Sequence, residues 1–195
     1  QRLFGVVAKA TELDVTVETR DRAHVRELVA ALEKGVIDEN TTFTCNGGIN
    51  FYGHYHHCHK RSGHGTVNLQ RALAVSCDVF FYNTGKLLGI DNLAQYGELA
   101  GLGKETGIDL PYEARGILPS SKWKARTLRQ QWVAGDTISV AIGQGYLAMT
   151  PMQLAVMTGG IANGGVWHKP HLVKDPNRVE PRKGNLNLDN VNRVI

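Results

Sequence analysis

The sequence lacks any long hydrophobic run and has few cysteine and aromatic residues. Among its 195 residues, no apolar stretch approaches the roughly 20 residues that a helix needs to cross a bilayer. Hydrophobic residues make up 42%, charged residues 21% and aromatic residues 7%, which is ordinary globular composition and excludes a mainly disordered chain. There is no initiating methionine and no basic-then-apolar leader, so we expect a piece of a longer gene product.

Charge of one sign is not in large excess either. Lysine and arginine number 22 and aspartate and glutamate 18, a formal net charge of +4, and the two signs are interspersed along the chain. A nucleic-acid-binding surface normally gathers basic residues on one face or in a stripe. The sequence therefore predicts no nucleic-acid partner.

The cysteines are too few, and odd in number, for the disulfide framework of a small secreted domain. Cys45, Cys58 and Cys77 nevertheless fall within one stretch, residues 45–77, that also holds five histidines. Three thiolates and one imidazole suffice to close a tetrahedral zinc shell with no open position. Such a zinc site would be structural rather than catalytic.

The spacing alone does not determine which histidine is the fourth ligand, or whether the cysteines bind a metal, form a disulfide or stay unlinked. We favour His64, because the flanking Gly63 and Gly65 let the backbone turn sharply to present the ring. A Cys45–Cys58 disulfide and three unlinked cysteines are the alternatives to a metal. The competing histidines are His54, His56, His57 and His59.

The hydrophobic pattern predicts strands and helices along the first half of the chain. Residues 13–19 alternate as in a half-buried strand, and residues 22–34 form an amphipathic helix that ends at Gly35. Residues 40–66 are rich in Gly, His and Thr and are expected to be loop-like. A helical pattern covers residues 68–88, with a break near Ser76, whose hydroxyl is expected to cap the next helix.

In the second half, Asp91 is expected to cap a short helix, and residues 101–136 form a long surface excursion. Ile138, Val140 and Ile142 then alternate with other residues, as in a strand. Thr150-Pro151-Met152-Gln153 has the cap, proline and glutamine of a helix start. Residues 175–195 are expected to be a loose tail.

Two runs of the sequence carry the motifs of one known family. They are Gly63-His64-Gly65-Thr66-Val67-Asn68-Leu69 and Ser76-Cys77-Asp78-Val79-Phe80-Phe81-Tyr82. With the later runs they resemble the transpeptidase domain of class B penicillin-binding proteins, of the penicillin-binding protein 2 type. The resemblance covers residues 28–174. The later runs are Gly101-Leu102-Gly103, Thr106-Gly107-Ile108-Asp109, Ile142-Gly143-Gln144-Gly145, Thr150-Pro151-Met152-Gln153 and Ile161-Ala162-Asn163-Gly164-Gly165.

The resemblance implies an α+β, β-lactamase/transpeptidase-like fold, present here mostly as its helical part with the core sheet incomplete. It also implies a D,D-transpeptidase that cross-links peptidoglycan in cell-wall elongation. In that family a serine attacks the D-alanyl-D-alanine end of a stem peptide, forms an acyl-enzyme and passes the acyl group to an amine. Penicillins and other β-lactams imitate that end and trap the same serine.

The family performs this chemistry with three motifs, Ser-x-x-Lys, Ser-x-Asn and Lys-Thr/Ser-Gly. The second is matched by Ser76-Cys77-Asp78, so the resemblance makes Ser76 and Asp78 the catalytic candidates. Asp21-Arg22-Ala23-His24 stands where Ser-x-x-Lys belongs, and the third motif is not found before Ile195. We therefore expect no turnover by this chain alone. Ser121-Lys122-Trp123-Lys124 fits the first motif literally but lies in the surface excursion.

The resemblance further implies a structural zinc ion whose ligands match Cys45, Cys58, His64 and Cys77. It places the parent protein at the periplasmic face of the inner membrane, anchored outside the present sequence, with membrane proteins of the elongation machinery as partners. Residues 1–24 do not follow the family. Two alternatives are kept: a non-catalytic scaffold member of the family, and a zinc-binding nucleic-acid module.

Overall fold

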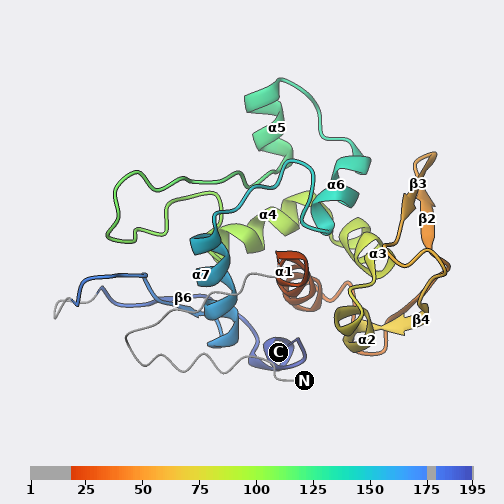
Figure 1. The fold of residues 1–195 in the computed structure, drawn as a ribbon, viewed down its shortest axis with the longest axis horizontal. Helices are drawn as coiled ribbons and strands as arrows, with labels where there is room; N and C mark the ends of the chain where they lie inside the picture. The colour runs from red at the N-terminus through yellow and green to blue at the C-terminus, as the bar shows by residue number, and fades with distance from the viewer. Residues whose placement is uncertain (1–18, 175–178, 195) are drawn as a thin grey trace.

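The computed structural model describes residues 19–174 and 179–194, and this part of the chain is mainly helical (Figure 1). The helices are α1 Thr19–Glu33, α2 Leu69–Ala74, α3 Asp78–Leu88, α4 Ile90–Leu99, α5 Ser121–Leu128, α6 Ala134–Ala141, α7 Pro151–Ala162 and α8 Leu188–Asn192. The strands are β1 Thr42–Cys45, β2 Gly48–Phe51, β3 His54–His57, β4 Gly65–Asn68, β5 Val166–Trp167 and β6 Arg182–Lys183. They pair antiparallel as β1–β4, β2–β3 and β5–β6.

Helix α1 lies in the middle of the described part, and α3, α4 and α7 pack around it (Figure 1). Leu28 and Val29 are buried as its apolar pattern predicts, but Ala30 and Ala31 are buried as well. The helix is covered on nearly all sides because neighbours surround it, and an amphipathic pattern does not reveal this. Its predicted end is confirmed, since Gly35 has the left-handed φ of +64° typical of a helix stop.

The predicted break near Ser76 is confirmed, because α2 ends at Ala74 and α3 begins at Asp78. The predicted cap is wrong: Cys77 occupies the N-cap position, and no side chain there accepts a hydrogen bond from the helix. Ser76 has a φ of +48°, which turns the chain one residue before the cap. Its hydroxyl faces α1 instead of the first turn of α3.

The structure differs from the sequence prediction in three other segments: residues 40–66, residues 138–142 and the surface excursion of residues 101–136. Residues 40–66 contain four-residue strands, whose patterns are too short to separate from a loop. The strand predicted from Ile138, Val140 and Ile142 is wrong, because the first two residues lie in α6 and Ile142 is its C-cap. Ile138 and Val140 are buried because α6 packs on α3. The surface excursion includes α5.

The start of α7 is confirmed in detail. Thr150 Oγ1 accepts from the Gln153 backbone N–H at 3.1 Å, and Gln153 Oε1 accepts from the Thr150 N–H at 2.9 Å. The described part of the expected tail is folded rather than loose. Val191 and Val194 are buried, and Asn190 donates to Glu33 of α1.

The strand expected at residues 13–19 falls almost wholly outside the described residues. Within the described ranges, none of the helices is both long enough and apolar enough to serve as a membrane span.

Candidate functional site

The four predicted metal ligands come together at the junction of the small strands with α3. Cys45 ends β1, Cys58 follows β3, His64 precedes β4, and Cys77 is the N-cap of α3. Their ligand atoms all lie within 4.8 Å of one another. The three thiols are buried and are not linked as disulfides.

Backbone contacts bring these distant segments together. The His64 N–H donates to the Cys45 carbonyl at 3.0 Å, and the Cys58 N–H donates to the Gly47 carbonyl at 2.9 Å. Gly63 has a φ of +79°, and a Cβ there would lie 2.2 Å from the Cys45 carbonyl oxygen. Only glycine fits this close approach, which is how it turns His64 toward the sulfurs.

The spacing of these atoms fits a tetrahedral zinc ion. Bonds of about 2.3 Å to sulfur and about 2.0–2.1 Å to nitrogen place those two ligand atoms about 3.6 Å apart. His64 Nδ1 lies 3.7 Å from Cys45 Sγ and 3.5 Å from Cys58 Sγ. Three soft sulfurs and one imidazole are also the donor set that zinc prefers.

Without a bound cation, the cluster does not favour three thiolates. Burial raises the pKa of the Cys77 thiol to about 12 and also raises the pKa of Cys58. Burial also acts to raise the pKa of Cys45, but hydrogen bonds from the backbone and from the neighbouring thiols lower it overall. Thiolates packed together in this environment need a cation to balance their charge. A divalent metal supplies that charge and displaces the thiol protons.

Ser76, the first catalytic candidate, lies beside α1. Its Oγ is 3.5 Å from His24 Nδ1, and the His24 ring stacks on Phe81 with centroids 3.5 Å apart. His24 is fully buried, and Ser76 is half-buried. The resemblance matches His24 to the lysine of the first motif and Ser76 to the serine of the second, and these two residues are in contact.

Asp78, the second catalytic candidate, faces the loop after β3. Its Oδ2 accepts from the His59 backbone N–H at 2.7 Å and lies 3.2 Å from His59 Nδ1. Asp78 lines a cavity of about 230 Å³, and Ser76 does not. The cavity is lined by His57, Cys58, His59, Arg61, Asp78, Tyr82, Ile142 and Gln144.

Ser76 and Asp78 have different neighbours, His24 of α1 and the loop after β3. Ser76 is left-handed and Asp78 is the first residue of α3, so the alternation of an extended strand does not apply to them. Sequence reasoning also missed two partners, His24 and His59. The position of His24 in the first-motif slot was the available signal for one of them.

The literal Ser-x-x-Lys match lies away from these residues. Ser121 Oγ donates to the Asp91 carboxylate at 2.7 Å, and Lys124 Nζ pairs with Asp136 at 2.5 Å. Both side chains are committed to contacts that position α5. This geometry does not favour Ser121 as a nucleophile.

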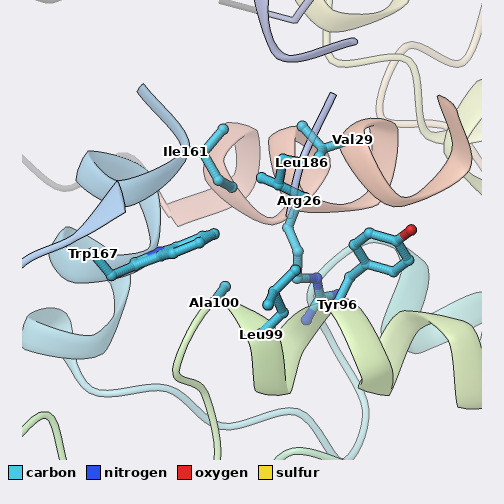
Figure 2. Close-up of a pocket in the computed structure, with 8 residues that line it drawn as sticks. All are labelled: Arg26, Val29, Tyr96, Leu99, Ala100, Ile161, Trp167 and Leu186. Carbon is cyan, nitrogen blue, oxygen red and sulfur yellow. The ribbon is translucent and has the colours of Figure 1, made fainter. Parts of the chain in front are cut away.

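Helix α1 also buries two ionisable side chains near the first-motif positions. Arg26 extends from α1 toward α4 and lines a small cavity of about 10 Å³ with Tyr96 and Trp167 (Figure 2). Its guanidinium nitrogens have no hydrogen-bond partner among the described residues, nor do the carboxylate oxygens of Glu27. Burial lowers the pKa of Arg26 and raises the pKa of Glu27 well above its usual value.

Comparisons with known proteins give one family. The model of the penicillin binding protein transpeptidase domain matches residues 26–192. The peptidoglycan D,D-transpeptidase MrdA of Acinetobacter baumannii is 38% identical over 157 residues, which cover 80% of this chain and 23% of that protein. The chain thus spans about a quarter of the length of this curated relative.

Two solved structures are similar to this chain in both sequence and backbone fold. Penicillin-binding protein 2 of Pseudomonas aeruginosa superposes with a TM-score of 0.84 at 35% identity, over 89% of this chain and 42% of that one. Penicillin-binding protein 2 of Helicobacter pylori, in a complex with MreC, superposes with a TM-score of 0.81 at 35% identity. The match covers 89% of this chain and 32% of that one.

The fold is therefore the β-lactamase/transpeptidase-like fold that the sequence predicted. The chain belongs to the penicillin-binding protein transpeptidase family, and within it to the penicillin-binding protein 2 type. The described residues hold mostly helices and three two-stranded sheets. Membership in this family does not favour the nucleic-acid module considered from the sequence.

Proposed function

We propose that this chain is part of a D,D-transpeptidase that cross-links peptidoglycan during cell-wall elongation. The observation that carries the proposal is the family match over residues 26–192, together with a relative whose name states that activity. In the proposed reaction a serine hydroxyl attacks the penultimate D-alanyl carbonyl, and terminal D-alanine leaves. An amine of a second stem peptide then takes the acyl group. The same carbonyl chemistry makes β-lactams ligands of the intact enzyme.

Ser76 and Asp78 are the residues of this chain proposed to serve that reaction. Ser76 lies against the α1 position that corresponds to the first-motif lysine, where a hydroxyl is able to pass a proton to or from the nucleophile. Asp78 lies at the first turn of α3, where its buried carboxylate orders the neighbouring loop through His59. Its proposed role is to position groups around the substrate.

Cys45, Cys58, His64 and Cys77 are proposed to hold a structural zinc ion. When bound, the ion supplies the positive charge that lets buried thiolates pack together, and it cross-links β1, the loop after β3 and α3. Because Cys77 lies between Ser76 and Asp78 in sequence, this centre fixes the start of α3. The zinc therefore acts on catalysis by holding that turn in place.

The residues of the first-motif slot favour a second candidate, a non-catalytic scaffold. Asp21 stands where the hydroxyl nucleophile belongs, and His24 stands where the lysine belongs. A carboxylate does not replace an activated hydroxyl in acyl transfer. With this sequence the chain alone is expected to form no covalent adduct with penicillin.

The cellular setting is proposed from the relatives. The Helicobacter pylori relative is described in a complex with MreC, so membrane proteins of the elongation machinery are the proposed partners. A location at the periplasmic face of the inner membrane is proposed with this substrate.

A chimera tests whether residues 36–174 still support acyl transfer when an intact first motif is present. Residues 36–174 of this chain replace the equivalent segment of the Acinetobacter baumannii relative, which keeps its own first and third motifs. We expect fluorescent penicillin to acylate the chimera, and Ser76→Ala to slow acylation by at least about 100-fold. A folded chimera that is not acylated would contradict the transpeptidase proposal and favour the scaffold.

A further inference from the structure

A second group of metal-binding side chains adjoins the proposed zinc centre and shares one residue with it. Cys58, His59 and Asp78 place a sulfur, a ring nitrogen and a carboxylate oxygen within 4.8 Å of one another. His59 Nδ1 is 3.8 Å from Cys58 Sγ and 3.2 Å from Asp78 Oδ2. These three donors suit a borderline divalent cation such as Zn²⁺.

The two carboxylate oxygens of Asp78 differ in their hydrogen bonding. Oδ2 accepts from the His59 backbone N–H, whereas Oδ1 is buried and has no hydrogen-bond partner among the described residues. A buried carboxylate oxygen without a donor is costly unless a cation or water compensates it. The exposed Arg61 lines the same cavity, and solvent screens its opposing charge.

The position of the group suggests what it does. The thiols of the four-ligand centre are at most 1% exposed, so a metal ion needs a route to them. The His59 side chain is 38% exposed, and the group lines the cavity of about 230 Å³. The His59 ring also lies 5.1 Å, centroid to centroid, from the ring of His64. A metal held by His59 thus lies beside the buried centre, with which it already shares Cys58 as a ligand.

We propose that Cys58, His59 and Asp78 form a loading position from which a divalent metal passes to the four-ligand centre. The ion binds the three donors at the cavity, and the Cys58 thiol proton goes to solvent. His64, Cys45 and Cys77 then replace His59 and Asp78 while Cys58 stays bound, and two more thiol protons leave. No oxidation or reduction takes place. This inference rests on the proposed zinc centre.

The first test measures loading of the full, metal-free chain with Zn²⁺ in stopped flow, using a metal indicator. His59→Asn and Asp78→Asn are each expected to slow loading at least about tenfold, because each removes one of the three donors that first hold the ion, while the final affinity, set by the other four ligands, changes less than about threefold. His57→Asn is the matched control, because His57 lines the same cavity but is outside both groups. Loading rates equal to that of the unaltered chain would overturn the proposal.

The second test isolates the three-donor position. In the Cys45→Ser/Cys77→Ser background, Co²⁺ is expected to bind once, more weakly than to the unaltered chain, with a thiolate charge-transfer band from Cys58. Adding Asp78→Asn should abolish that binding, and its persistence would overturn the proposal. Failure of the zinc centre itself would look different: the unaltered chain would then bind Co²⁺ no more tightly than the double variant.

Discussion

Ser76 Oγ and His24 Nδ1 lie 3.5 Å apart although 52 residues separate them in sequence. The contact joins the turn before α3 to α1. His24 is held rigidly, since its ring is buried and stacked on Phe81. The packing of α1 against the turn at Ser76 therefore brings together the two positions that the resemblance matches to the first and second motifs.

Backbone strain at Ser76 should be measurable. Its φ of +48° is left-handed, a conformation that costs a residue with a side chain about 1–2 kcal/mol and glycine little. We expect Ser76→Gly to have a free energy of unfolding about 1 kcal/mol higher than Ser76→Ala, because neither variant has the hydroxyl and only glycine relieves the strain. Urea denaturation of both variants measures the difference, and an equally stable alanine variant would rule out strain at this turn.

The zinc proposal makes a prediction for stability. Cys58→Ala is expected to lower the free energy of unfolding by several kcal/mol in the presence of Zn²⁺ and to speed hydrogen exchange across residues 40–78. A chelator should produce the same change in the unaltered chain and little further change in the variant. His54→Ala, an exposed substitution on β3, is the control. Equal melting temperatures of the Cys58 variant and the unaltered chain would contradict a structural metal.

Much of the site could be predicted from residue type and local pattern. The ligand set came from the clustering of three cysteines with histidines and from the resemblance, and Gly63 indicated which histidine turns inward. The start of α7 could be predicted because a capping box involves only residues three positions apart, here Thr150 and Gln153. The break before α3 was likewise visible in the sequence around Ser76.

What could not be predicted depends on tertiary packing. Nothing local shows that Asp78 meets His59 or that Ser76 meets His24, since each contact joins segments distant in sequence. The alternation of Ile138 and Val140 was misleading because helix α6 is buried between elements that a short window does not include. Short apolar runs do not separate a strand from a buried helix.

Arg26 is expected to destabilise the fold. Its guanidinium is buried in an apolar setting without a hydrogen-bond partner among the described residues (Figure 2). Taking a charged group out of water without a hydrogen-bond partner costs a folded protein several kcal/mol, part of which an apolar side chain of similar volume recovers. We therefore expect Arg26→Leu to raise the free energy of unfolding by about 2 kcal/mol in urea denaturation. The exposed Arg115→Leu should change it by less than about 0.5 kcal/mol; a loss of stability in the Arg26 variant would show that the charge has a partner.

Glu27 should make stability depend on pH. Burial raises the pKa of its carboxyl well above the usual value, although the nearby charge of Arg26 lowers it in part. The folded state therefore keeps this proton at pH values where the unfolded chain has lost it. Its contribution to stability is complete below the unfolded pKa of about 4.5 and is lost as the pH rises toward the folded value, at no more than about 1.4 kcal/mol per pH unit.

Glu27→Gln isolates this effect, because the amide has nearly the same shape and does not titrate in this range. Free energies of unfolding are measured in urea between about pH 5 and pH 7 for both proteins, and the difference removes the contribution of every other group. We expect the unaltered chain to lose stability relative to Glu27→Gln as the pH rises. A constant difference would mean that the Glu27 carboxylate is already ionised at pH 5 and reaches water or a cation in the folded protein.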